Sequence, residues 1–374
     1  MRSLAPIVIG LSAVVVAIRD GEAVALSVRH QTSAGELTGL PFGPFDPEGH
    51  RTFELALRAF VTEQTRFDLG YVEQLYTFGD KGRDAPLADL GGGDPEARVI
   101  SVGYLALAPA AVDTHFAGSE WRPWSHIFPW EDWRSGRPPA LAAVEAALRV
   151  WAGNDAQKLA RARLVFALDG APWNEERVLE RYELLYEAGL VQEAARDRGE
   201  AAPTRTDVLI AAVGEAMISD HRRILATALG RLRGKLKYRP VIFELMPDAF
   251  TLSALQRTVE AIAGVPLHKQ NFRRALERAE LVEGRNRGQR ISRSMPSPST
   301  SMLGARSATR SATSRAEPHD IAQPLEPWPR LTHTPSMPLL PSTGGPSGNI
   351  GRAPFHRCTW LSRAAPGNQS FSTL

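Results

Sequence analysis

The chain has 374 residues and a mass of 40.8 kDa, with 43% hydrophobic and 23% charged residues, which is typical of a soluble protein of two or three domains. Its single cysteine excludes a disulfide framework and a cysteine-rich zinc site. The pI of about 9.2 comes from an uneven charge distribution. Residues 1–221 hold 21 Lys and Arg against 32 Asp and Glu, residues 222–284 hold 12 against 6, and residues 285–374 hold 11 against 3. An acidic body therefore precedes a basic module and a basic tail.

The first 30 residues predict two β-strands joined by a tight turn. A run rich in valine and isoleucine, residues 4–18, leads through Asp20-Gly21 into a second such run at 23–28. Asp-Gly favours a two-residue hairpin turn. A secretory signal is the alternative, but no Ala-x-Ala cleavage site ends the apolar run. No stretch is long enough for a transmembrane helix, and we expect a cytoplasmic protein.

Strands and one helix are predicted in the next hundred residues. Residues 34–49 are rich in Gly and Pro and predict a loop, whereas residues 52–64 have the apolar spacing of a helix packed on a sheet. Residues 71–78 and 99–107 predict further strands. This order of elements predicts an α/β or α+β domain and excludes an all-helical one.

Three segments of this domain, residues 40–67, 70–84 and 99–107, together resemble a Nudix domain. More narrowly, they are similar to the Nudix-like half of the NrtR-like transcriptional regulators of NAD metabolism. The resemblance implies an α/β/α sandwich, which we assign to residues 1–137. A working Nudix box carries several glutamates on one helix face, where they hold divalent metal at a pyrophosphate. With Arg58 at the arginine position, Ala59 and Thr62 replace two glutamates and only Glu63 remains.

The degraded box predicts a domain without metal chemistry and without a required cofactor, because one carboxylate is a poor magnesium site. The resemblance implies that such a domain is a ligand sensor. The resemblance implies that its ligand is ADP-ribose or a related NAD-derived nucleotide. We place Arg58, Glu63, Phe78 and Arg83 at this site. Arg83 would contact phosphate, or simply pair with Asp84 in a turn. Phe78 would stack on a base, or end its strand in the core.

Helical stretches follow at residues 140–152, 175–200 and 207–236, and we assign residues 138–220 to a helical connecting region. It is a linker, a dimer interface or an insertion. The tryptophan-rich segment before it, residues 120–133, predicts a packed connection between domains in preference to a stacking surface. His126 and His221 have no ligand partners nearby in the sequence, so no transition-metal site is assigned.

A helix-turn-helix layout is predicted after residue 240. Residues 250–264 form a helix with Thr251 as N-cap and Gly264 as C-terminal stop, and a four-residue turn leads to a second helix at 269–281. Together with the basic stretch 221–240, this part resembles the winged helix of the same regulators, which we assign to residues 221–284. The second helix would read DNA, through a set of polar side chains: Lys269, Gln270, Asn271, Arg273 and Arg274.

The end of the chain departs from the family pattern. The two-stranded wing is expected after residue 281, but the sequence there turns into Arg, Ser and Pro without strand or helix periodicity. We therefore expect a truncated or replaced wing and a disordered tail over residues 285–374.

The resemblance of the two parts to these regulators implies a homodimeric DNA-binding transcriptional regulator that binds a double-stranded DNA operator. We expect it to repress genes of NAD metabolism. The alternative is an enzyme, a Nudix hydrolase of ADP-ribose-type substrates with Glu63 as surviving acidic residue and Mg²⁺ as its metal. A third reading is a ligand-binding protein that has lost DNA binding with its wing.

Overall fold

The computed structural model describes residues 7–32, 35–80, 98–109, 118–200, 206–237, 239–247, 249–278, 282–285 and 290–293. All of them lie in one compact unit, residues 1–330. The second unit, residues 331–374, lies outside the described residues, and so does the rest of the predicted disordered tail beyond residue 293.

A mixed sheet forms the centre of this unit. Its strands are β1 (Ile7–Arg19), β2 (Glu22–Thr32), β3 (Gly35–Gly39), β4 (Phe42–Pro44), β5 (Tyr71–Phe78), β6 (Arg98–Leu107) and β7 (Ser119–Pro123). They follow the order β3-β2-β1-β6-β5, with β4 paired to β1 and β7 paired to β2. The long central pair β1–β6 is parallel, and the other named pairs are antiparallel.

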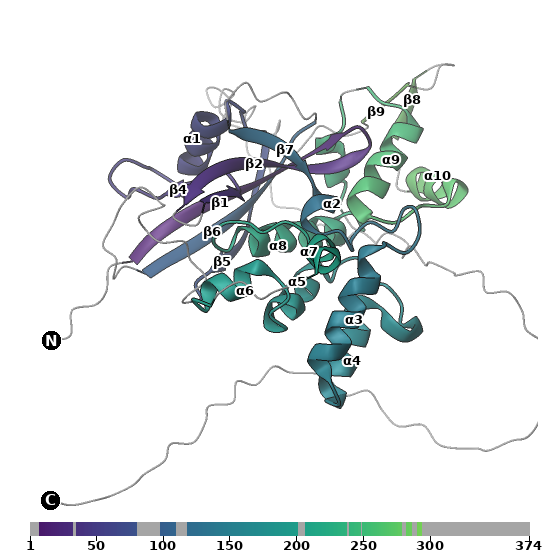
Figure 1. Ribbon diagram of the computed structural model, residues 1–374. Helices are drawn as coiled ribbons and strands as arrows, with labels where there is room; N and C mark the ends of the chain where they lie inside the picture. Colours follow the sequence, from purple (N-terminus) through teal and green to yellow (C-terminus); the bar gives the residue numbers. More distant parts are fainter. Residues whose placement is uncertain are drawn as a thin grey trace, which may run out of the picture. The chain divides into compact units, whose positions relative to one another are not determined.

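The hairpin predicted at the N-terminus is confirmed. Arg19 of β1 pairs with Glu22 of β2, and the two residues between them, Asp20 and Gly21, have φ of 52° and 79°. Two consecutive left-handed residues match the right-handed twist of the paired strands, which is why Asp-Gly is favoured there. In Figure 1 the hairpin reaches from the sheet toward α9 (Leu252–Ala263), and α9 packs against β2.

Helices cover both faces of the sheet. The remaining helices are α1 (Phe53–Thr65), α2 (Trp124–Ile127), α3 (Ala140–Ala152), α4 (Ala156–Phe166), η2 (Leu168–Gly170), α5 (Val178–Glu187), α6 (Gln192–Asp197), α7 (Asp207–Val213), α8 (His221–Lys235), η3 (Val241–Leu245) and α10 (Lys269–Arg278). None of the helices in the described part of the chain is long and apolar enough to cross a membrane.

Alternation along β1 decides which helix lies on which face. Leu11, Ala13 and Val15 pack with α1, whereas Val14 and Val16 share a core with α8. Figure 1 shows α1 on one side of the sheet and α8 on the other. The predicted α+β class, with an α/β/α sandwich, is thereby confirmed.

The prediction of a loop over residues 34–49 was wrong, because β3 and β4 lie within it. Two of their glycines, Gly39 and Gly43, lie against closely packed side chains. A Cβ at Gly39 would lie 2.6 Å from the side chain of Ile218, and one at Gly43 would lie 2.7 Å from the ring of Phe60. Glycine inside a strand often marks such an approach, and the sequence does not distinguish it from glycine in a turn.

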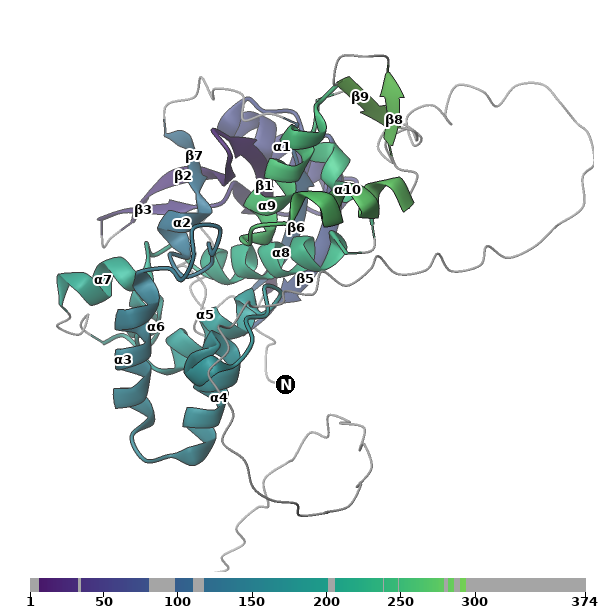
Figure 2. The same ribbon diagram turned by 90° about the vertical axis from the view of Figure 1, so that its right-hand side faces the viewer.

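The predicted helical region is present but divided into more pieces. Gly189 (φ 69°) follows α5 and divides the predicted helical stretch 175–200 into α5 and α6. Gly214 (φ 73°) separates α7 from α8. Helix α4 was not predicted. α3 packs against both α4 and α7, and α5 packs along α8. Figure 2 shows α3 and α4 as a pair of helices on the side of α5 and α6 away from the sheet.

The tryptophan-rich segment is a packed connection, as predicted, although it contains β7 and α2. Trp121, Trp124 and Trp130 are all buried, and Trp130 is fully enclosed. Trp124 and Trp130 belong to the core between the sheet and the helical region, and Trp121 belongs to the core on the α1 face of the sheet.

Candidate DNA-binding helix and ligand-binding residues

The helix-turn-helix begins with a capped helix. Thr251 Oγ1 accepts a hydrogen bond from the Ala254 amide at 3.0 Å, and Gly264 ends α9 in the left-handed region with φ of 70°. The Phe272 amide then bonds to the His268 carbonyl as α10 starts. Both predicted caps are confirmed, because they depend only on residues next to each other in the chain.

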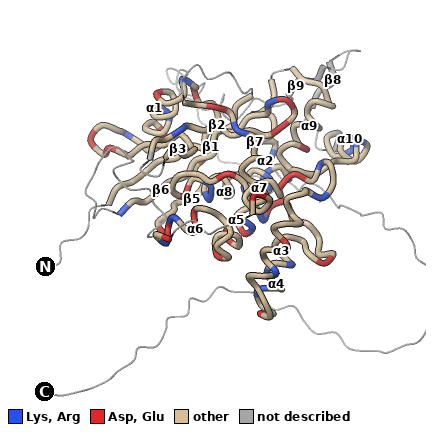
Figure 3. Tube along the Cα trace, in the orientation of Figure 1, with Lys and Arg blue, Asp and Glu red and all other residues tan. Residues whose placement is uncertain are grey.

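α10 has one apolar and one polar face. Phe272, Ala275 and Leu276 are buried, with 4%, 6% and 2% of their surface exposed. The side chains predicted to read DNA are all exposed: Lys269, Gln270, Asn271, Arg273 and Arg274. Figure 3 shows basic positions, in blue, along α10. Guanidinium groups pair with guanine, and carboxamides with adenine, in the major groove of DNA, so the polar face has suitable chemistry.

The residues predicted to bind a nucleotide are placed less favourably. Arg58 donates to Glu54 and to the carbonyls of Leu69 and Gly70, so its guanidinium ties α1 to the turn before β5. Phe78 is buried with 3% exposed, which agrees with its core alternative. Glu63 is exposed on α1, and Arg83 lies outside the described residues. The structure does not bring Arg58 and Phe78 together at an open surface.

The donor set on α1 does not fit magnesium. Beside Glu63 stand Ala59 and Thr62, and the Thr62 hydroxyl is bonded to Asp68 at 3.0 Å. Within the described residues, no group of three or more His, Cys, Asp or Glu side chains is suitable for a metal ion. Mg²⁺ prefers several oxygen ligands in octahedral geometry, and one carboxylate does not supply them.

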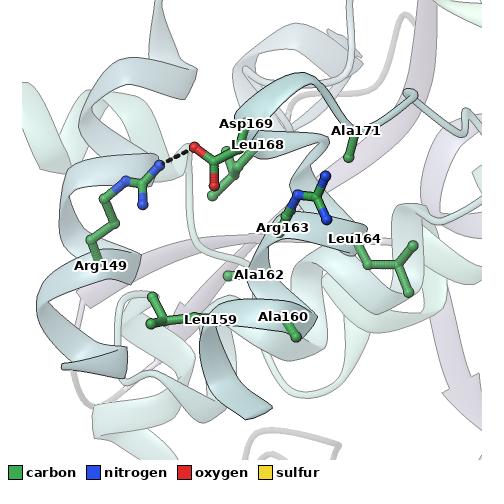
Figure 4. A pocket seen from close by; sticks show the side chains of 9 residues that line it. All are labelled: Arg149, Leu159, Ala160, Ala162, Arg163, Leu164, Leu168, Asp169 and Ala171. Carbon is green, nitrogen blue, oxygen red and sulfur yellow. Dashed lines mark hydrogen bonds and ion pairs between the residues drawn. The ribbon is translucent and has the colours of Figure 1, made fainter. Parts of the chain in front are cut away.

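A cavity of about 280 Å³ lies elsewhere, between α3, α4 and η2 (Figure 4). Its lining is mostly leucine and alanine, with Arg149 and Arg163 at the edge, and Arg149 is paired with Asp169 at 2.7 Å. The cavity contains none of the residues predicted to bind the ligand.

Comparison with known proteins identifies the C-terminal module. Residues 242–296 match the family model described as the NrtR DNA-binding winged helix domain. This segment is therefore similar to the DNA-binding winged helix of NrtR proteins. A stretch of 64 residues is 41% identical to the ADPR responsive transcriptional repressor NtrR of Acinetobacter baylyi. That stretch covers 17% of this chain and 26% of the relative, so the match spans about a quarter of the relative's length.

Comparison with solved structures gives matches that extend over most of this chain. The crystal structure of Shewanella oneidensis NrtR has 18% identity and a TM-score of 0.44, and the match covers 76% of this chain and 94% of that one. The structure of a MutT/nudix family protein from Enterococcus faecalis has 13% identity and a TM-score of 0.46, with 78% and 88% covered. With the NrtR winged helix matched by its family model, the predicted resemblance to NrtR-like proteins is confirmed.

The prediction of a truncated or replaced wing was wrong. β8 (Val282–Arg285) and β9 (Arg290–Arg293) form an antiparallel pair, with Val282 opposite Arg293. The winged-helix match extends to residue 296 and includes both strands. These strands were not predicted because each has only four residues and no alternation of apolar and polar side chains, so neither shows a detectable periodicity. β9 therefore lies within the residues that were assigned to the tail.

The basic charge of residues 222–284 has a different role than expected along α8. Arg222 pairs with Glu193, Arg233 with Glu131 and Lys235 with Glu73, and all three cations are buried. α8 lies on the sheet, whereas the winged-helix match starts at residue 242. These three cations of α8 are therefore paired with acidic residues of the body, whereas Lys269, Arg273 and Arg274 of α10 are exposed.

Sequence reasoning missed a buried cluster around His221. Its Nδ1 accepts a hydrogen bond from the Leu40 amide at 3.0 Å, and its Nε2 lies 3.5 Å from Ser12 Oγ. Burial, together with the charges of His30 and Arg196, lowers the pKa of His221 to about 3. Ser12 and Leu40 are 209 and 181 residues away in the chain, so no local pattern indicates these contacts.

Proposed function

We propose that the protein is a transcriptional repressor that acts in the cytoplasm as a homodimer and binds double-stranded DNA through α10. The observation that carries this proposal is the exposed polar face of α10 inside a segment matched as an NrtR DNA-binding winged helix. A dimer would present two such helices to successive turns of one operator.

The α/β/α sandwich is the proposed sensor, and ADP-ribose or a related NAD-derived nucleotide is its proposed ligand. Two observations support this. The relative matched over 64 residues is named an ADPR responsive repressor, and the segment that resembles a Nudix box forms the helix α1, with Glu63 but with Ala59 and Thr62 in place of two glutamates. Binding without hydrolysis is what such a helix would allow. The target genes would be those of NAD metabolism.

DNA binding is tested with duplexes that tile the region upstream of the protein's own gene. Arg273→Ala should weaken binding to the best duplex by roughly tenfold, the typical loss for one arginine contact to a base or phosphate. Arg163→Ala, which removes an exposed arginine of α4, is the matched control and should leave affinity unchanged. Equal affinities for Arg273→Ala and the native protein would contradict the assignment of α10.

The ligand is tested by calorimetry with ADP-ribose, followed by an assay for AMP release in the presence of Mg²⁺. We expect saturable binding, no turnover, and a change in DNA affinity when ADP-ribose is added. Turnover that disappears in Glu63→Gln would instead support the hydrolase alternative. If the protein binds DNA but not ADP-ribose, the proposal that α10 binds DNA stands and the proposal that the sandwich domain senses ADP-ribose is wrong.

A further inference from the structure

Glu131 lies at the centre of a buried charge cluster. Its carboxylate accepts from Arg181 Nε at 2.5 Å and from Arg181 Nη2 at 3.0 Å, and it also accepts from Arg233 Nη1. The exposed fractions are 3% for Glu131, 0% for Arg181 and 3% for Arg233. Other guanidinium nitrogens of the two arginines donate to the backbone carbonyls of Val165, Asn174 and Glu175. A buried cluster of this kind is stable only when its members are all paired.

The same cluster holds the end of α9. Arg233 Nε donates to the Ile262 carbonyl at 2.8 Å, and the Trp133 amide donates to the Gly264 carbonyl at 2.6 Å. The fit at Gly264 is tight, because a Cβ there would lie 2.3 Å from the carbonyl oxygen of Glu131. Only the short turn 265–268 separates this point from α10.

Each arginine comes from a different part of the fold. Arg181 belongs to α5 of the helical region, and Arg233 belongs to α8 on the sheet. Burial by itself would raise the pKa of Glu131, but the charges of Arg181 and Arg233 outweigh burial and lower the pKa, which keeps the carboxylate ionised. One carboxylate thereby joins the helical region and the sheet to the last turn of α9.

We propose that Glu131, Arg181 and Arg233 are positioning residues that fix the recognition helix α10 relative to the rest of the chain. The helical region 138–220 is then part of the DNA-binding apparatus through Arg181, in addition to connecting two domains. The effect on DNA affinity rests on the function proposed above, whereas the effect on the order of α9 and α10 does not.

The test compares full-length Glu131→Gln with Glu193→Gln. Glu193 is a matched control, since it is 1% exposed, pairs with the fully buried Arg222 at 3.5 Å, and joins α6 to α8 without a hydrogen bond or ion pair to α9 among the described residues. Both variants are examined by urea unfolding, by hydrogen exchange of peptides from 252–278 and 7–19, and by binding to the best upstream duplex.

Both variants should unfold at lower urea, since each leaves buried arginine charge with less compensation. Only Glu131→Gln should raise exchange in 252–278 relative to 7–19, by about fivefold for the loss of one hydrogen bond, and only it should weaken DNA binding. If Glu131→Gln does not fold, Arg233→Lys replaces it, because lysine keeps the charge and lacks the Nε donor to Ile262. Equal exchange ratios in test and control would overturn the proposal. Absence of DNA binding by the native protein would refute the repressor function, and the exchange ratios would still decide the positioning role.

Discussion

Acidification perturbs the buried histidine at the start of α8. Because His221 Nδ1 accepts the Leu40 amide at 3.0 Å, a second proton on the ring removes this hydrogen bond and places a charge beside Phe42 and Arg196. Burial is the main reason that the pKa of His221 falls from 6.5 to about 3. In the folded state the imidazole of His221 therefore stays neutral, whereas in the unfolded state it takes up a proton below pH 6.5. The contribution of His221 to the free energy of unfolding is therefore fully present above pH 6.5, and it is lost as the pH falls toward 3.

The magnitude follows from proton linkage. With a pKa of 6.5 in the unfolded state and about 3 in the folded state, acidification from neutral pH to about pH 5 lowers the free energy of unfolding by about 2 kcal/mol through this one group. Paired carboxylates such as Glu131 add to the acid sensitivity at lower pH, because their pKa values are also lowered in the folded state. A variant without the imidazole separates the two contributions.

His221→Asn is that variant, since the asparagine Oδ1 can accept the Leu40 amide in place of Nδ1. Urea unfolding at neutral pH and near pH 5 should show that His221→Asn loses about 2 kcal/mol less than the native protein. His126→Asn, at an exposed histidine, should behave like the native protein. An equal acid loss in His221→Asn and native protein would refute the reasoning.

Two further substitutions test the packing around α9 and α10 by urea unfolding. Gly264→Ala should cost about 1 kcal/mol for its left-handed φ and more for the contact with the Glu131 carbonyl, whereas Gly199→Ala, with φ of 66° and open space, should cost only the first part. Equal losses would mean that α9 shifts freely away from Glu131. Phe272→Ala should cost about 3 to 5 kcal/mol, because it empties a buried site, while Leu164→Ala at a half-exposed position should cost far less. A small loss for Phe272→Ala would place that ring outside the core.

Local patterns predicted those parts of the fold whose causes are local. The Asp20-Gly21 turn, the caps of α9 and the two faces of α10 depend on residues within a few positions of each other. The same is true of the absent carboxylates beside Glu63, which follow directly from the spacing on α1.

The remaining features depend on contacts between distant parts of the chain. β3 and β4 contain glycine because Ile218 and Phe60 approach them closely, and the pair Glu131–Arg233 is separated by 102 residues. The net positive charge of residues 222–284 was overestimated as a DNA-binding feature for the same reason. Glu73 and Glu193, which pair with cations of α8, lie outside that segment. Counting charge along a sequence does not reveal which charges are already neutralised.

The hydrophobic core on the α8 face of the sheet has a consequence for modularity. Val14 of β1, Tyr182 of α5 and Leu276 of α10 belong to one continuous cluster of buried side chains. A fragment cut before residue 242 would expose the apolar surface that α9 and α10 cover, and an isolated winged helix would lack its support. A chimera in which the segment from residue 242 onward is replaced by that of a relative should therefore fold only under one condition. The relative's surface of α8 and its segment around Trp133 must be exchanged as well.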